Sequence, residues 1–249
     1  MIAAAIPIFN EARTIGDVVT ETRKFVDEVL VVDDGSTDGG ASAAEQAGAT
    51  VIRHAANAGK GAALQTALRW GRKRRELSHL VLIDGDGQHA PGDIPRLLEA
   101  AQKGGIDILV GSRFLGENNA PLYRLFGLHV LSASASLGSG IHLTDSQSGF
   151  RVLSHRAVGV MNLTERAFSV ETEMQFIGAA SGLRATEVPI AIRYAGPARR
   201  SPVIHGVSVL LRTIRMTALK RPLRLPLLIA TPVLALQIGR TRGAATKAQ

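Results

Sequence analysis

The sequence predicts an α/β protein with a mostly parallel sheet that is covered by helices on both faces. In its first half, short apolar runs alternate with amphipathic or alanine-rich stretches, and this alternation is typical of βαβ units. Polar clusters directly follow three of the apolar runs. Because ligands of such sheets bind beyond the carboxyl ends of the strands, we expect the functional site at that edge.

The individual elements follow from hydrophobic periodicity and from turn residues. Strands are expected at 2–8, 28–33, 49–53, 79–84 and 106–112. Helices are expected at 12–26, 39–47, 60–76, 93–103, 120–140, 171–181 and 203–219, with a turn and a short strand within 145–154 and a strand-like run at 185–194. We expect three segments along the chain: a domain over 1–200, a helical segment over 201–240 and a disordered tail over 241–249.

Composition excludes several kinds of site. The chain has 249 residues, no cysteine and a formal net charge of +8. Without cysteine there is no disulfide, no thiolate metal site and no cysteine nucleophile. The positive charge predicts an anionic partner, for which nucleic acid, acidic lipid and phosphorylated substrates all qualify. Nucleic acid is disfavoured, because the few aromatic residues do not alternate with the basic clusters and no helix-turn-helix or zinc-finger spacing occurs.

The two ends of the sequence indicate where in the cell the protein acts. The chain enters a strand-like run at residue 2 with no basic region and no cleavage-site pattern, which predicts a cytosolic protein. The apolar segment 225–238, LPLLIATPVLALQI, follows Lys220, Arg221 and Arg224, and it is shorter than the about 20 residues of a spanning helix. We expect peripheral contact with the cytoplasmic face of a membrane. A C-terminal helix packed on the domain is the alternative, and insertion of 223–239 is left open.

Two carboxylates separated by one glycine end the apolar run at 79–83. Asp84 and Asp86 repel each other unless a positive charge lies between them, and oxygen ligands suit Mg²⁺ or Mn²⁺. A plain polar loop is the alternative. An EF-hand is excluded, because its fifth, sixth and twelfth positions would hold Gln88, His89 and Pro95. The glycines of NAGKGAA, residues 57–63, do not have P-loop spacing, but they allow main-chain N–H groups to approach an anion.

Eight sequence blocks taken together resemble one family. In order they are IPIFNEARTI, VVDDGSTDGG, NAGKGAAL, LIDGDGQHAPGDIP, VGSRF, DSQSGFRVLS, VETEM and VPIAIRY. They cover roughly residues 2 to 195 and resemble family 2 glycosyltransferases of the GT-A fold, in particular the dolichyl-phosphate mannose synthase-like branch. The resemblance implies a Rossmann-like GT-A sheet, followed here by C-terminal amphipathic or interfacial helices.

The resemblance also implies a nucleotide-sugar donor that binds across the strand ends. The residues that would meet its base and ribose are Pro7, Phe9, Glu11, Val32 and Asp34. Those that would approach the ribose, the metal and the diphosphate are Asp84, Gly85 and Asp86, with Gln88 as a third oxygen ligand of Mg²⁺ or Mn²⁺. The basic residues that would meet the phosphates or the sugar are Arg113, Arg193 and Arg199. Many relatives carry tyrosine at the position of Phe9 and lysine at that of Arg199.

The activity that the resemblance implies is transfer of a hexose, with inversion, from a UDP- or GDP-sugar to a polyprenyl phosphate such as dolichyl or undecaprenyl phosphate. Asp145 and Glu173 would lie near the sugar and the acceptor, together with Arg113 as catalytic residues. A turn residue and a helix-surface residue are the alternative interpretations of these two acids. A soluble enzyme of the same fold that acts on a glycan or a small hydroxylated acceptor is the alternative function, and in that case one acid must accept a proton.

Overall fold

Seven strands form one sheet in a computed structural model that describes residues 1–115, 122–165, 169–191 and 202–226. The strands are β1 (Ile2–Ile8), β2 (Glu28–Asp33), β3 (Thr50–Arg53), β4 (His79–Leu82), β5 (Ile108–Ser112), β6 (Arg151–Ser154) and β7 (Ala185–Pro189). Their order within this described part is β3-β2-β1-β4-β6-β5-β7. β6 is antiparallel to β4 and β5, and the other pairs are parallel, so the prediction of a mostly parallel sheet is confirmed.

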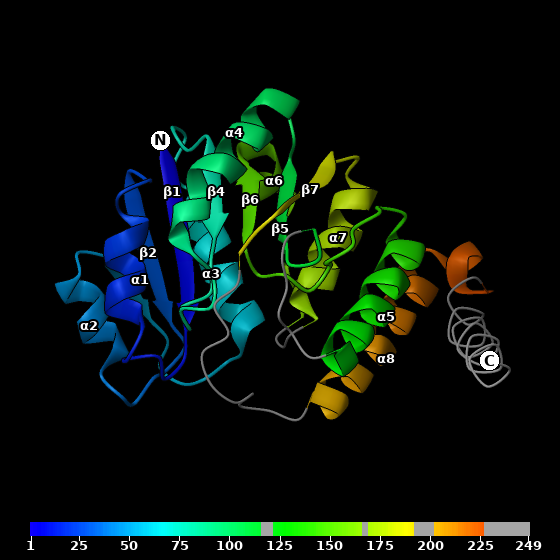
Figure 1. Cartoon of the computed structure of the whole chain (residues 1–249), viewed down its shortest axis with the longest axis horizontal. Helices are drawn as coiled ribbons and strands as arrows, with labels where there is room; N and C mark the ends of the chain where they lie inside the picture. The colour runs from blue at the N-terminus through cyan, green and yellow to red at the C-terminus, as the bar shows by residue number, and fades with distance from the viewer. Residues whose placement is uncertain (116–121, 166–168, 192–201, 227–249) are drawn as a thin grey trace, which may run out of the picture.

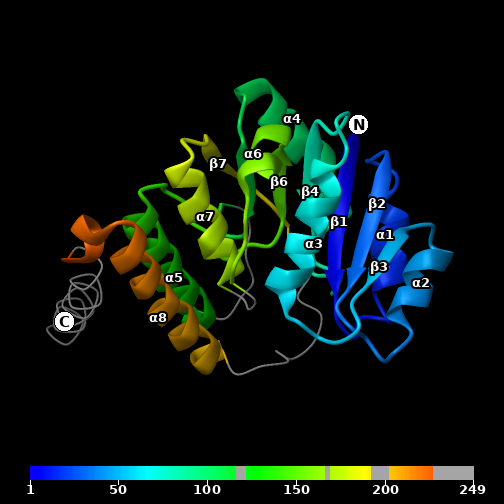
Figure 2. The ribbon, with the colours of Figure 1, turned by 180° about the vertical axis from the view of Figure 1, so that it is seen from behind.

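Helices cover both faces of the sheet, as the alternating sequence predicted (Figure 1). One face carries α1 (Ile15–Thr22), α2 (Gly40–Gln46) and α4 (Ile94–Gly104). The opposite face carries α3 (Lys60–Arg72), α6 (His155–Val160) and α7 (Val170–Ala180), which lie in front of the sheet in Figure 2. Successive side chains of a strand point to opposite faces, so Ala3 and Ala5 of β1 join one core while Ala4 and Ile6 join the other.

Two long helices lie side by side beyond the β7 edge of the sheet (Figures 1 and 2). They are α5 (Leu122–Ser139) and α8 (Pro202–Lys220), and α8 leads into a short 3-10 turn, η2 (Pro222–Arg224). Val209, Thr213 and Met216 are buried on one side of α8, whereas Leu211 and Leu219 on its other side are exposed. In the part of the chain that the structure describes, no helix is both long enough and apolar enough to cross a membrane.

Most element ends differ from the expected ones by only a few residues. The helix expected at 60–76 ends at Arg72, and the one expected at 12–26 is confined to Ile15–Thr22. Before α4, a short 3-10 turn, η1 (Pro91–Asp93), takes up part of the loop after β4. The division at residue 200 and the tail after residue 240 lie in segments 192–201 and 227–249, outside the described residues, so this division stays a prediction.

Candidate functional site

The carboxyl ends of β1, β2, β4 and β5 meet at one edge of the sheet, because these strands run in the same direction. At the end of β1, Phe9 is 41% exposed, and Pro7 and Glu11 are half-buried. Near the end of β2, by contrast, Val32 has no exposed surface and lies in the core. Neither the side chain nor the main chain of Val32 is therefore exposed to a nucleoside in this structure, and a contact between Val32 and a nucleoside stays a prediction.

Asp34, at the end of β2, holds the turn that begins α3. Its Oδ2 atom accepts hydrogen bonds from the main-chain N–H groups of Gly59, at 2.7 Å, and of Ala58, at 3.1 Å. Its Oδ1 atom lies 2.7 Å from Nδ1 of His54, whose other ring nitrogen lies 2.9 Å from Oγ1 of Thr66. Asp34 is only 2% exposed, so in this structure its carboxylate positions the 57–60 turn.

The loop after β4 is fixed by a close approach and by short-range hydrogen bonds. A Cβ atom on Gly85 would lie 2.6 Å from Cγ2 of Ile8, so only glycine fits between the two acids. The carbonyl oxygen of Gly85 accepts a hydrogen bond of 2.7 Å from Oγ1 of Thr14. Asp86 accepts hydrogen bonds from the main-chain N–H and the side-chain Nε2 of Gln88, at 3.0 and 2.8 Å. The side chains of Asp86 and Gln88 therefore lie next to each other in this loop.

Asp84 forms an ion pair that the sequence did not predict. The ammonium group of Lys60, the first residue of α3, lies 2.7 Å from Oδ1 of Asp84 and 2.8 Å from Oε1 of Glu171 in α7. Burial of the ammonium group opposes its charge, but the two carboxylates outweigh burial and raise the pKa of Lys60 above its ordinary value. Burial also opposes ionisation of Asp84, and the positive charge of Lys60 is the main reason that the pKa of this carboxyl is lowered.

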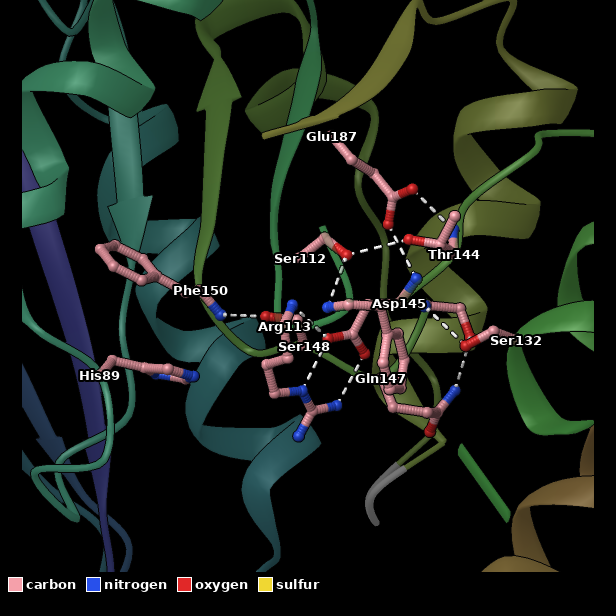
Figure 3. A network of polar contacts seen from close by, with 12 residues as sticks. His89, Ser112, Arg113, Ser132, Thr144, Asp145, Gln147, Ser148, Phe150 and Glu187 are labelled. Atoms are coloured by element: carbon pink, nitrogen blue, oxygen red, sulfur yellow. Dashed lines mark hydrogen bonds and ion pairs between the residues drawn. The ribbon is translucent and has the colours of Figure 1, made fainter. Parts of the chain in front are cut away.

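His89 and Gly149 form the other side of Asp84. Nδ1 of His89 lies 3.9 Å from Oδ2 of Asp84, and the His89 ring packs against Phe150 with ring centres 5.3 Å apart (Figure 3). Burial lowers the pKa of His89 despite the neighbouring carboxylates. A Cβ atom on Gly149 would lie 2.5 Å from Oδ2 of Asp84, so the main chain before β6 touches this carboxylate.

Arg113 and Asp145 form a bidentate pair, which Figure 3 shows at the centre of a polar network. Nε and Nη2 of Arg113 lie 2.6 and 2.7 Å from the two carboxylate oxygens of Asp145, and the main-chain N–H of Arg113 also donates to Asp145. Glu187 of β7 accepts hydrogen bonds from the N–H groups of Thr144 and Asp145. Asp145 has no exposed surface, so its visible role is to orient Arg113.

Three predicted site residues remain: Glu173, Arg193 and Arg199. Both carboxylate oxygens of Glu173 accept hydrogen bonds from residues 164 and 165, at distances of 2.6 to 3.1 Å. Glu171, two positions earlier in the first turn of α7, is the acid that reaches Lys60 and through it Asp84. A catalytic role for Glu173 stays a prediction. Arg193 and Arg199 lie outside the described residues.

Sequence reasoning also missed Arg151, the first residue of β6. Its guanidinium is fully buried and donates to the main-chain oxygens of Ser146, Ser148 and Glu171, at 2.7, 2.9 and 3.2 Å. Burial lowers the pKa of Arg151, and nearby carboxylates, with Glu171 first among them, oppose this shift. Arg151 therefore ties the loop that carries Asp145 to the start of α7. The arginine in DSQSGFRVLS was the available signal, but an apolar strand context says nothing about which carbonyl groups surround it.

The acidic loop fits a hard divalent cation by the chemistry of its donors. Asp84, Asp86 and Gln88 supply oxygen atoms, and an ammonium group already lies against Asp84. Across the described ranges 1–115, 122–165, 169–191 and 202–226, no three or more acidic or histidine side chains are grouped so that they could hold a metal ion. Mg²⁺ in proteins is commonly held by one or two carboxylates, with substrate phosphates and water as the other ligands, and this loop suits that arrangement.

Comparison with known proteins identifies the family. The family described as Glycosyl transferase family 2 matches residues 4–159, more than half of the chain. The chain belongs to the family 2 glycosyltransferases. This glycosyltransferase is 32% identical over 219 residues to an undecaprenyl-phosphate mannosyltransferase of Micrococcus luteus, and the match covers 82% of the chain and 89% of that protein. It is 31% identical over 243 residues to a UDP-N-acetylglucosamine–dolichyl-phosphate N-acetylglucosaminyltransferase of Methanococcus voltae, covering 87% and 96% of the two chains.

A solved structure confirms the fold of this glycosyltransferase. Glucosyl-3-phosphoglycerate synthase from Mycobacterium tuberculosis, in complex with Mn²⁺, UDP and phosphoglyceric acid, superposes with a TM-score of 0.70 at 19% identity, over 87% of this chain and 78% of the other. The shared architecture is the GT-A fold, so the expected fold class is confirmed. The resemblance of the sequence to the polyprenyl-phosphate mannose synthase branch is confirmed by the relatives.

Proposed function

We propose that this glycosyltransferase moves a hexose from a UDP- or GDP-sugar to a polyprenyl phosphate, with Mg²⁺ or Mn²⁺ bound by Asp84, Asp86 and Gln88. The names of the relatives support the lipid acceptor, since both the mannosyltransferase and the N-acetylglucosaminyltransferase are named for polyprenyl phosphates. The Mn²⁺ and UDP in the complex of the fold relative support a divalent cation beside a nucleotide.

The chemistry that we propose is a single displacement. A phosphate oxygen of the acceptor attacks the anomeric carbon as its bond to the donor diphosphate breaks, so the configuration inverts. A divalent cation would stabilise the charge that develops on the leaving diphosphate. Arg113, held in one orientation by Asp145, would add a fixed positive charge near the same oxygens. A lipid phosphate is ionised near neutral pH, so neither Asp145 nor Glu173 has to act as a strong base.

The observation that carries the lipid acceptor is the outer face of α8 and η2. Its apolar residues are exposed by more than half, with values of 53% for Val207, 61% for Leu211, 72% for Leu219 and 94% for Leu223. Segment 202–226 contains five basic residues and no acidic residue. Exposed apolar side chains beside cations are typical of helices that lie at the surface of an anionic membrane. We therefore propose peripheral membrane association through this face.

The donor is tested first by thermal shift with UDP, GDP, CDP and their sugars, each with Mn²⁺, Mg²⁺ or EDTA. A ligand at a hundred times its dissociation constant stabilises the fold by about 2.7 kcal/mol, which such an assay detects. We expect one nucleotide to stabilise the wild type, and EDTA or Asp86→Ala to abolish the effect. No shift with any nucleotide would contradict the proposal.

The acceptor is tested by vesicle flotation and by transfer to a polyprenyl phosphate. The Leu211→Glu, Leu219→Glu double variant should lose binding to anionic vesicles, because charged groups replace the apolar contact. Val160→Glu is the matched control, since Val160 is 40% exposed but lies in α6. Nucleotide binding should be unchanged in both variants. A wild type that binds a nucleotide but neither vesicles nor a polyprenyl phosphate would favour the soluble-acceptor alternative.

A further inference from the structure

Lys60 and Glu171 form a buried ion pair beside the acidic loop. The Lys60 side chain is 17% exposed and that of Glu171 is 4% exposed, and the lysine ammonium group lies within 2.8 Å of both Glu171 and Asp84. Two buried charges of this kind are costly unless each is paired, and here each carboxylate has the same ammonium group as its partner. The arrangement places one positive charge between two acids from separate segments, the loop after β4 and helix α7.

All three members of the cluster are held by their own surroundings. Asp34 fixes Gly59, immediately before Lys60, through a hydrogen bond of 2.7 Å. Arg151 donates to the main-chain oxygen of Glu171 at 3.2 Å. Asp84 lies against Gly149, with no room for a Cβ atom. The position of the ammonium group is therefore set by the fold rather than by the reach of a flexible lysine.

The ammonium group also sets the charge of the site. The three carboxylates of Asp84, Asp86 and Glu171 and the ammonium group of Lys60 together have two net negative charges. Two negative charges match one divalent cation. The ammonium group of Lys60 lies 2.7 Å from Oδ1 of Asp84, whereas Oδ2 lies toward His89 and Gly149.

We propose that Lys60 and Glu171 act through Asp84 and together set the charge that a divalent cation meets there. Lys60 holds one oxygen of Asp84, and Glu171 holds Lys60 so that the ammonium group does not fully neutralise the acidic loop. This inference rests on the proposed function, since it assumes that a divalent cation binds at Asp84 and Asp86.

The pair makes an unusual prediction about its two variants. Lys60→Met removes the positive charge that competes for Asp84 and should tighten Mn²⁺ binding. Glu171→Gln leaves the lysine free to pair with Asp84 alone and should weaken Mn²⁺ binding. By Coulomb's law, one unit charge about 6 Å from a divalent ion changes affinity by about tenfold even in water. The double variant should return to within a few-fold of the wild type.

Mn²⁺ is the probe, titrated into full-length protein with and without UDP or GDP and followed by the electron paramagnetic resonance signal of the free ion. The matched controls are Lys103→Met and Glu99→Gln, which remove the charges of an ion pair on α4 whose side chains are 76% and 61% exposed. These controls should leave Mn²⁺ affinity within about twofold of the wild type, since exposed pairs are screened by water and salt. Circular dichroism checks that each variant is folded.

The outcomes separate this inference from the proposed function. If the wild type binds Mn²⁺ and both single variants bind it more weakly by similar factors, the pair has only a structural role and the inference is wrong, while the proposed metal site stands. If the single variants bind like the wild type, the inference is equally wrong. If the wild type binds Mn²⁺ neither alone nor in the presence of UDP or GDP, the metal site of the proposed function fails, and the inference falls with it.

Discussion

Replacing Gly149 by alanine tests whether the position of Asp84 controls the site. The three nearest atoms to a Cβ at this position all belong to Asp84: Oδ2 at 2.5 Å, Oδ1 at 2.8 Å and Cγ at 2.9 Å. Ordinary contact begins at 3.4 Å, so Oδ2 would have to retreat by roughly 0.9 Å. The backbone of Gly149 does not have a positive φ, so the substitution acts through this contact and not through backbone strain.

Two measurable effects follow from that displacement. Overpacking of a buried contact costs about 1–3 kcal/mol, and we expect the lower part of this range because a single side chain can move. A displacement of about 1 Å at a reacting site can cost about a hundredfold in activity. We therefore expect Gly149→Ala to lower the free energy of unfolding by only about 1 kcal/mol. The same substitution should reduce the rate of sugar transfer by about a hundredfold.

The assay combines urea unfolding with transfer of the radiolabelled sugar whose nucleotide stabilises the wild type. Gly159→Ala is the matched control, because a Cβ at this position in α6 meets nothing within 4 Å. Alanine is favoured over glycine in a helix by about 0.5–1 kcal/mol, so this control should be as stable as the wild type or more stable, with full activity. If Gly149→Ala keeps the activity of Gly159→Ala, the position of Asp84 does not limit the reaction and the reasoning fails.

Two further substitutions test the polar framework of the site, and a third tests a half-buried histidine at the other end of β4. Asp145→Asn breaks the buried pair with Arg113 and should lower the free energy of unfolding by about 3 kcal/mol in urea; a loss below 1 kcal/mol would contradict this. Asp34→Ala removes the acceptor of the N–H groups of residues 58 and 59 and should speed their amide hydrogen exchange by at least about tenfold. Unchanged exchange would show that the turn does not depend on Asp34. Burial and the N-terminal charge lower the pKa of His79 below 6.5, so the unfolded chain takes up a proton more readily as the pH falls through 6.5. Stability should therefore fall from about pH 7 to pH 5.5, and less steeply in His79→Leu; equal slopes would exclude His79 as a source.

The sheet was predictable because most strands before residue 113 contain a continuous apolar run that is followed by turn residues. The structure places β1 and β2 at the predicted residues and shortens the next expected strands by one to two residues at their ends. The acidic loop was predictable for the same reason, since Asp84 and Asp86 follow an apolar run directly. The local sequence pattern was therefore sufficient to predict features that depend only on neighbouring residues in the sequence.

The partners of Asp84 were not predictable in this way. In the sequence, Lys60 is only one residue of a glycine-rich turn, and the two acidic residues of VETEM are both glutamates, so residue type does not distinguish them. Which of them faces the site depends on the rotation of α7, and this rotation follows from packing that involves Arg151 and the buried residues around it. The resemblance implies a role for Glu173, whereas the structure brings Glu171 to Lys60.

The direction of β6 explains how distant segments come together at this edge. β6 lies between β4 and β5 and is antiparallel to both, so its beginning lies beside the carboxyl ends of its neighbours. A parallel strand at this position would bring its last residues to the site, but β6 brings the residues that precede it, 145–150. Asp145 therefore reaches Arg113 at the end of β5, and Gly149 reaches Asp84 at the end of β4. A single reversed strand thus joins the two halves of the site, and because both contacts depend on this strand, Gly149→Ala and Asp145→Asn should not have additive effects on activity.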